Sequence, residues 1–416
     1  MPRRVTRTSR RHNARLYRRR RVLAFVALAA ALALLVFAVW TLSGSCSNDG
    51  NGQGSGGSGT SASSSTSATP SPSPTAWTGP PSSKLDLELR ETITSTAISP
   101  KSVVSTGTGY VFAQNMMYRH TITVYDSRTL KLVKTIKDSI GAAKFQVKGS
   151  SGTLKGAPVE AAVMPDGRFM FVSQYSMYGD GFYHEGHDVC APGDGTDRSY
   201  VYRVPLDTLK VDKVIKVGAV PKYLAVTPDQ KYLLVSNWCS YSVSIVDTRT
   251  SKQVKGIYLG PYPRGIAVDP ESRYAYVAVM GTYDIARIDL VDFSLTWIRG
   301  VGSGPRHLCM APNGKYLYAT LNNEGNIAKI SPKTLKVVDK VYTGAEPRSM
   351  AIAPDGKSLY VVNYGSSTMG KIRTSDMKIL QVVNTNALPI GITYDAPTKS
   401  VWVCCYTGSI MVFRES

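Results

Sequence analysis

Five basic residues follow a proline at equivalent points of this sequence, and they form its clearest candidate for binding chemistry. They are Lys101, Lys222, Arg264, Arg306 and Arg348. The last four of their prolines are each 42 residues apart, so the charges should occupy one position of a repeat. Cations gathered in this way attract carboxylate, phosphate or sulfate groups. The alternative is a structural role, in which each cation pairs with the neighbouring repeat.

A second candidate is the segment 176–199, which combines two histidines with several carboxylates. Asp180, His184 and His187 could together hold a divalent metal, because imidazole and carboxylate are common ligands. The spacing His-x-x-His differs from the helical His-Glu-x-x-His of metalloproteases. The other interpretation is an acidic loop that lies over the basic residues and neutralises them.

The cysteines suggest how this segment is held. Six cysteines in 416 residues are too few for a disulfide scaffold. Cys190 lies within the segment 176–199, and Cys239 ends a predicted strand of the next repeat. In an oxidising compartment a Cys190–Cys239 disulfide would fix the insertion to its neighbour.

The elements that position these residues follow the 42-residue period. Seven residues after each proline comes a turn such as Pro354-Asp355-Gly356, in which Pro presets φ and Gly accepts positive φ. Short alternating runs flank each turn, and two more runs follow it. Four strands in about 42 residues are the size of one β-propeller blade.

Seven copies of this unit are present, so we expect an all-β, seven-bladed propeller with four-stranded antiparallel blades. The blades begin at Pro100, Pro158, Pro221, Pro263, Pro305, Pro347 and Pro389. The last copy stops after three strands, and the alternating run 85–93 is the candidate for the missing fourth. Closing the ring in this way removes free sheet edges.

The antiparallel order of the strands also fixes which loops share a face. The loops between second and third strands and the connections between blades must lie together. Both long insertions, 137–156 and 176–199, fall on that face, and so does the position after each blade-starting proline. Binding sites concentrate where long loops stand on a rigid scaffold.

The runs Tyr360-Val-Val-Asn363 and Tyr232-Leu-Leu-Val-Ser-Asn237 follow turns of the Pro-Asp-Gly-Lys type. In these motifs the chain resembles the YVTN-repeat β-propeller family over essentially all of residues 84–416. The resemblance implies a seven-bladed propeller. It does not imply one chemistry, because relatives include surface-layer proteins, haem-d1 propellers and lactonase-like enzymes.

The N-terminal part has a different composition. Residues 1–21 hold ten arginines and no acid, and residues 22–42 carry no charge. A helix of that length spans about 31 Å, enough for one membrane crossing with the N-terminus in the cytoplasm. We expect an uncleaved signal anchor; a lipoprotein at Cys46 and ordinary cleavage are the alternatives. The Gly/Ser/Thr/Pro-rich residues 43–83 form a disordered linker, and the propeller follows at 84–416, outside the cytoplasm.

Charge argues against nucleic acid as a partner. Of the net charge of +20, only +11 belongs to residues 84–416. No nucleophile elbow, phosphate loop or dinucleotide motif is present. We therefore expect a monomeric recognition module whose partner is a cell-envelope glycan, an anionic small molecule or a protein, and no cofactor beyond a metal in 176–199. The alternative is a lactonase-like or metal-assisted hydrolase with its site on the same face.

Overall fold

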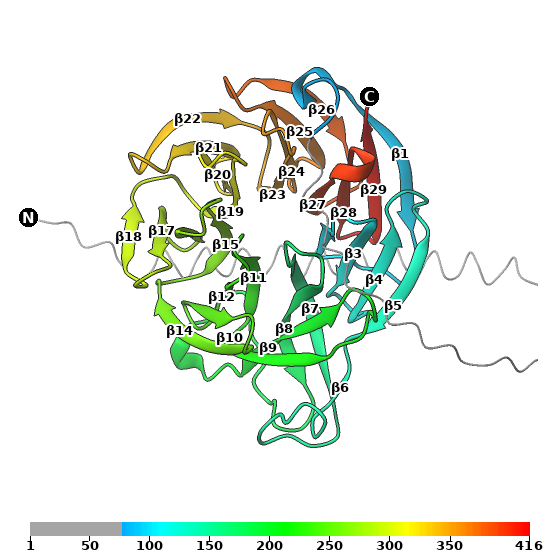
Figure 1. Cartoon of the computed structure of the whole chain (residues 1–416), viewed down its shortest axis with the longest axis vertical. Coiled ribbons are helices and arrows are strands. Elements are labelled where there is room, and N and C mark those ends of the chain that lie inside the picture. Colours follow the sequence, from blue (N-terminus) through cyan, green and yellow to red (C-terminus); the bar gives the residue numbers. More distant parts are fainter. Residues whose placement is uncertain (1–76) are drawn as a thin grey trace, which may run out of the picture. The chain divides into compact units, whose positions relative to one another are not determined.

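The computed structural model describes residues 77–416, which form a ring of seven blades (Figure 1). The predicted seven-bladed propeller is confirmed. Blade one consists of β2 (Ser102–Ser105), β3 (Tyr110–Asn115), β4 (Thr121–Asp126) and β5 (Leu132–Lys137). Blade three consists of β11 (Pro221–Val226), β12 (Tyr232–Asn237), β13 (Ser242–Asp247) and β14 (Lys252–Tyr258). Blade four consists of β15 (Pro263–Val268), β16 (Tyr274–Val279), β17 (Asp284–Asp289) and β18 (Leu295–Ile298).

The remaining regular blades repeat this order of four antiparallel strands. Blade five consists of β19 (Pro305–Met310), β20 (Leu317–Leu321), β21 (Asn326–Ser331) and β22 (Lys336–Tyr342). Blade six consists of β23 (Pro347–Ile352), β24 (Ser358–Asn363), β25 (Thr368–Arg373) and β26 (Ile379–Asn384). Three short 3-10 helices lie at η1 (Ser82–Lys84), η2 (Pro192–Asp194) and η3 (Ala396–Thr398).

Blade two differs from the expected copy because the two insertions build one structure. Its strands are β7 (Thr153–Val163), β8 (Phe169–Tyr178), β9 (Arg198–Pro205) and β10 (Lys213–Ala219), and β6 (Ile140–Gly141) pairs with the beginning of β7. β7 begins five residues before Pro158, because its first residues pair with the end of β8, as in Lys155 opposite Tyr178. The two insertions therefore extend a single hairpin, which projects beyond the ring near β6 (Figure 1).

Blade seven closes the ring as predicted. β1 (Leu87–Thr94) pairs antiparallel with β29 (Ser409–Glu415), and β28 (Ser400–Cys405) and β27 (Pro389–Asp395) complete the sheet. Leu87 lies opposite Glu415 and Thr94 opposite Ser409. The first and last strands therefore share one blade, and the sheet has no missing strand.

A buried polar network, here called the closure cluster, joins this blade to blade six. Lys371 Nζ donates to Glu415 Oε1 at 2.5 Å and to the carbonyl of Leu85 at 2.7 Å. Tyr394 donates to Glu415 Oε2 at 2.8 Å, and Tyr360 donates to the same carboxylate. The Lys371 and Glu415 side chains are fully buried. Every charge in the closure cluster therefore has a bonded partner.

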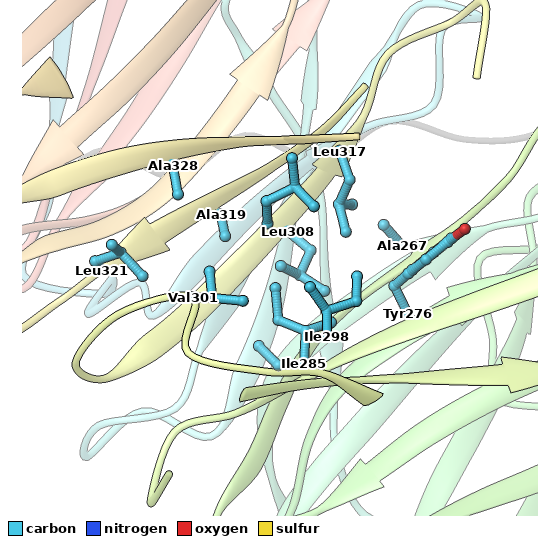
Figure 2. Close-up of a cluster of buried hydrophobic side chains, with 12 residues drawn as sticks. Ala267, Tyr276, Ile285, Ile298, Val301, Leu308, Leu317, Ala319, Leu321 and Ala328 are labelled. Atoms are coloured by element: carbon cyan, nitrogen blue, oxygen red, sulfur yellow. The ribbon is translucent and has the colours of Figure 1, made fainter. Parts of the chain in front are cut away.

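The core lies between blades. The aromatic residue thirteen positions after the blade proline is buried in each copy that has one: Phe171, Tyr276, Tyr318, Tyr360 and Trp402. Figure 2 shows the layer between blades four and five, where Leu308 and Leu317 pack beside Tyr276. Apolar residues of adjacent sheets thus hold each blade against the next.

The predicted membrane span, residues 22–42, lies outside the described residues, as do the tail 1–21 and most of the linker. In the part from Trp77 onward, no helix is both long and apolar enough to cross a membrane. The last linker residues contact the propeller. Trp77 lies 6.3 Å from the Tyr394 ring, and the backbone N–H of Ser82 donates to Asp355 at 2.8 Å.

Candidate functional site

Two backbone features aim the residue after the blade proline toward the central channel. The residue before the proline takes a left-handed conformation in blades three to seven, at Val220, Tyr262, Gly304, Glu346 and Leu388. The pairing register then shifts directly after each of these prolines. Such a bulge redirects one side chain. A β-branched residue such as Val220 at φ 53° is strained, and strain of this kind is concentrated at functional sites.

The five predicted cations come together around the channel, and we call them the basic ring. Only 4 to 6% of the surface is exposed to solvent in four of them: Lys101, Lys222, Arg264 and Arg306. The fifth, Arg348, is half-buried. Arg306 Nε donates to the carbonyl of Arg348 at 3.1 Å. Burial and the charge of Arg264 lower the pKa of Lys101, and burial together with Arg264 and Arg348 lowers the pKa of Arg306. The ring therefore holds like charges close together in a poorly hydrated place.

One carboxylate inside the ring was not anticipated from the sequence. Glu160 Oε1 lies 3.8 Å from Lys101 Nζ and 4.0 Å from an Arg264 guanidinium nitrogen. Both separations exceed hydrogen-bond distance. Burial raises the pKa of Glu160, against the opposing effect of Lys101 and Arg264. A signal existed: in blade two the position after the proline is Val159, and the acid follows one residue later.

Lys222 is held between two aromatic rings at the edge of the channel. Its Nζ lies 4.2 Å from the centre of the Tyr175 ring and 5.1 Å from that of Trp238. Asp188 of the insertion approaches Nζ to 3.7 Å. Burial, with Arg264 nearby, lowers the pKa of Lys222 to about 7. This lysine therefore changes charge near neutral pH.

The insertion is fixed at this edge by a disulfide and hydrogen bonds. Cys190 and Cys239, the pair expected from the sequence, are bonded, with their Cα atoms 5.3 Å apart. Trp238 Nε1 donates to the carbonyl of Asp188 at 3.2 Å, and Tyr241 donates to the carbonyl of Cys190 at 2.7 Å. These bonds hold Asp188 beside Lys222, so the acidic loop supplies one carboxylate to the basic ring.

The residues considered for a metal are placed otherwise. Asp180, His184 and His187 are exposed. Asp180 accepts hydrogen bonds from Ser151 and Tyr183, and the backbone N–H of His184 donates to Asp197. Within residues 77–416, no group of three or more His, Cys, Asp or Glu side chains is arranged to hold a metal ion.

A cavity of about 190 Å³ occupies the channel, and we call it the axial cavity. Glu160, Tyr223 and His307 line it, each two residues after a blade proline. Tyr223 and His307 belong to blades three and five, yet the hydroxyl lies 2.8 Å from Nε2. The equivalent residue of blade four is Gly265, where a Cβ would come within 2.7 Å of the Arg306–His307 backbone. The missing side chain lets Tyr223 reach across that blade.

A second hollow, here called the rim groove, lies on the loop face between blades seven and one. Its volume is about 770 Å³. Hydroxyl and amide side chains predominate in its lining, together with Arg119 and two tyrosines, Tyr118 and Tyr406. Tyr118 is 83% exposed. Arg306 and Arg264 are close enough to influence the pKa of Tyr406, so the rim groove adjoins the basic ring.

Comparison with known proteins supports the fold alone. No family model matches the chain, and no curated protein matches it, so the resemblance to YVTN-repeat propellers stays a prediction. Among solved structures, this chain is similar to hydrazine synthase from Kuenenia stuttgartiensis, with a TM-score of 0.61 and 20% sequence identity. The match covers 77% of this chain and 97% of the other. At this identity the likeness shows a shared propeller architecture.

Proposed function

We propose that this chain is a membrane-anchored, extracytoplasmic recognition module whose basic ring binds an anionic ligand of the cell envelope, a glycan or an acidic protein segment. The observation that carries the proposal is the state of Lys101. Its side chain is 5% exposed, and its Nζ has no hydrogen-bond partner among the described residues. A buried cation without hydrogen bonds is unfavourable, and a bound anion would satisfy it.

The charge balance supports an external partner. Five basic side chains face one carboxylate within the ring, Glu160, and two others at its edge, Asp188 and Glu346. The acidic insertion therefore neutralises the ring in part. The basic side chains of the ring lie close together, and like charges repel strongly where water is scarce. An incoming carboxylate, phosphate or sulfate would therefore be stabilised.

The rim groove favours a glycan over a protein segment. Its hydroxyl and amide groups can exchange hydrogen bonds with sugar hydroxyls, and the exposed Tyr118 ring offers an apolar face beside them. A polymer in this groove would have the basic ring at one end.

Substitution of two ring arginines tests the site. Arg264→Ala combined with Arg306→Ala should abolish binding of acidic oligosaccharides or polyglutamate, measured by calorimetry, while the fold survives. In the unsubstituted chain the affinity should fall as salt is added. The matched control is Arg273→Ala with Arg299→Ala, two exposed arginines that pair with Asp289 and Asp284. A ring variant that melts at a lower temperature yet binds normally would refute the site.

Anchoring needs a separate experiment. Protease added to intact, wall-stripped cells should release a soluble fragment that begins within residues 43–83. Protection of that segment would contradict the proposed topology.

A further inference from the structure

The axial cavity below the basic ring contains polar groups with unused hydrogen-bonding capacity. Three of its hydroxyl side chains are already engaged. Ser102 donates to Gln114 at 2.6 Å, Ser349 donates to the carbonyl of Ile390 at 2.8 Å, and Thr393 accepts the backbone N–H of Ser105 at 3.1 Å. The groups that remain for a ligand are the Tyr223 hydroxyl, the hydroxyl proton of Thr393 and the Glu160 carboxylate, which Ser102 also approaches.

The direction of the bond between His307 and Tyr223 follows from the chemistry of its neighbours. The backbone N–H of Met350 lies 2.9 Å from His307 Nδ1, and because an N–H only donates, Nδ1 must be the acceptor. Burial, assisted by the charges of Arg264 and Arg306, lowers the pKa of His307 to about 3, so the ring is neutral at pH 7. Its proton is therefore on Nε2 and is donated to the Tyr223 oxygen at 2.8 Å.

Tyr223 consequently keeps its own proton for another acceptor. It presents a hydrogen-bond donor at the cavity. Lys101 and Arg264 do not line the cavity themselves, but they approach the carboxylate of Glu160, which does, to 3.8 Å and 4.0 Å. These three donors suit an anionic oxygen. Glu160 is the single carboxylate lining the cavity, and in its ionised form it can only accept. It would repel an anion that brings no donor and would bond to one that carries a hydroxyl.

We propose that the axial cavity binds a small hydroxy-carboxylate, such as the uronic acid unit of an acidic glycan. The ligand carboxylate meets Lys101, Arg264 and the Tyr223 hydroxyl, and a ligand hydroxyl donates to Glu160. This inference rests on the proposed function, because it names the ligand class of the same site. Selection works partly by repulsion, since anions without hydroxyl groups leave Glu160 facing a like charge.

The test uses three six-carbon probes on the full-length chain in detergent, measured by calorimetry. Glucuronate carries carboxylate and hydroxyls, hexanoate carries the carboxylate alone, and glucose carries hydroxyls alone. We expect glucuronate to bind at least tenfold more tightly than either of the others. Tyr223→Phe should weaken glucuronate binding about tenfold, whereas Tyr258→Phe, on an exposed strand, should not change it.

Glu160→Gln gives the sharper result, because it removes the charge and keeps the shape. Hexanoate should then bind more tightly and glucuronate less tightly, which reduces the preference about tenfold. Thermal melting of each variant confirms that it is folded. If glucuronate and hexanoate bind equally, and both are lost in the variant carrying Arg264→Ala and Arg306→Ala, the hydroxy-carboxylate inference is wrong and the proposed function stands. If glucuronate does not bind while acidic polymers do, the hydroxy-carboxylate inference is also wrong. If no anion binds, the inference and the proposed function are both wrong.

Discussion

Lys371 and Lys101 are both buried in this propeller, and their surroundings differ in a way that separates structure from binding. Lys371 in the closure cluster donates to Glu415 and to the carbonyl of Leu85, and no part of its side chain is exposed. Lys101 in the basic ring is almost as deeply buried, but its nearest carboxylate oxygen is 3.8 Å away and its Nζ has no hydrogen bond. A buried charge that is fully bonded supports the fold. A buried charge left without bonds is unfavourable by itself and points to a missing partner.

The largest expected effect comes from breaking the satisfied lysine. Lys371→Met leaves the Glu415 carboxylate buried without its cation, so the free energy of unfolding should fall by about 3–5 kcal/mol. Denaturant unfolding measures this. Adding Glu415→Gln to the same chain removes the unpaired charge and should recover most of the loss. A single variant as stable as the unsubstituted chain would show that the closure cluster does not hold the ring together.

The disulfide tests the edge of the basic ring. Cys190→Ser with Cys239→Ser should cost the insertion about 2–4 kcal/mol of local stability. Proteolysis within residues 176–199 should accelerate, while the melting temperature of the blades changes little, since each interface between blades has its own core. Unchanged cleavage would mean that the bonds from Trp238 and Tyr241 hold the loop alone.

The same substitution at the unsatisfied lysine should have the opposite sign. Lys101→Met removes a buried ammonium group that lacks hydrogen bonds and reduces repulsion with Arg264, which should raise the free energy of unfolding by about 1–2 kcal/mol. Denaturant unfolding beside the Lys371→Met chain makes the contrast direct. Destabilisation of similar size in both chains would show that the two lysines are equivalent and that the basic ring is structural.

The smallest effect is a dependence on pH at Lys222. Its pKa is about 7 in the folded chain and about 10.4 when unfolded, so between these values the unfolded chain binds more protons. Stability contributed by this group therefore rises with pH. Relative to Lys222→Met, the unsubstituted chain should gain about 1 kcal/mol in the free energy of unfolding from pH 7 to pH 8. A constant difference between the two chains would contradict the lowered pKa.

Most of the architecture could be predicted because it repeats. The 42-residue spacing placed the blade prolines from Pro221 to Pro389 and four of the five basic residues, and the incomplete last copy indicated that an N-terminal strand closes the ring. The pairing of Cys190 with Cys239 followed from their positions in adjacent blades. A period identifies equivalent positions, and the topology then brings them together.

The period does not reveal contacts that depend on one blade being different. Tyr223 reaches His307, 84 residues away, because Gly265 lies between them without a side chain. Glu160 enters the ring from a blade whose position after the proline is Val159. Lys371 is the fourth residue of β25, whose four central residues are all buried, so a cation is unexpected there until its bond to Glu415 is known. These contacts cross between blades, so they require the three-dimensional arrangement.

The pairing of β1 with β29 has a consequence for how the molecule is made. Among the propeller strands, β1 leaves the ribosome first and has to wait, unpaired, for β29, because its partner residues are Ser409 to Glu415. Contacts this distant along the chain form late and slowly. Local blades can assemble during synthesis, but the ring stays open with two sheet edges until residues 409–415 arrive. Chaperone protection of residues 87–94 in the nascent chain would therefore matter more than protection of any interior strand.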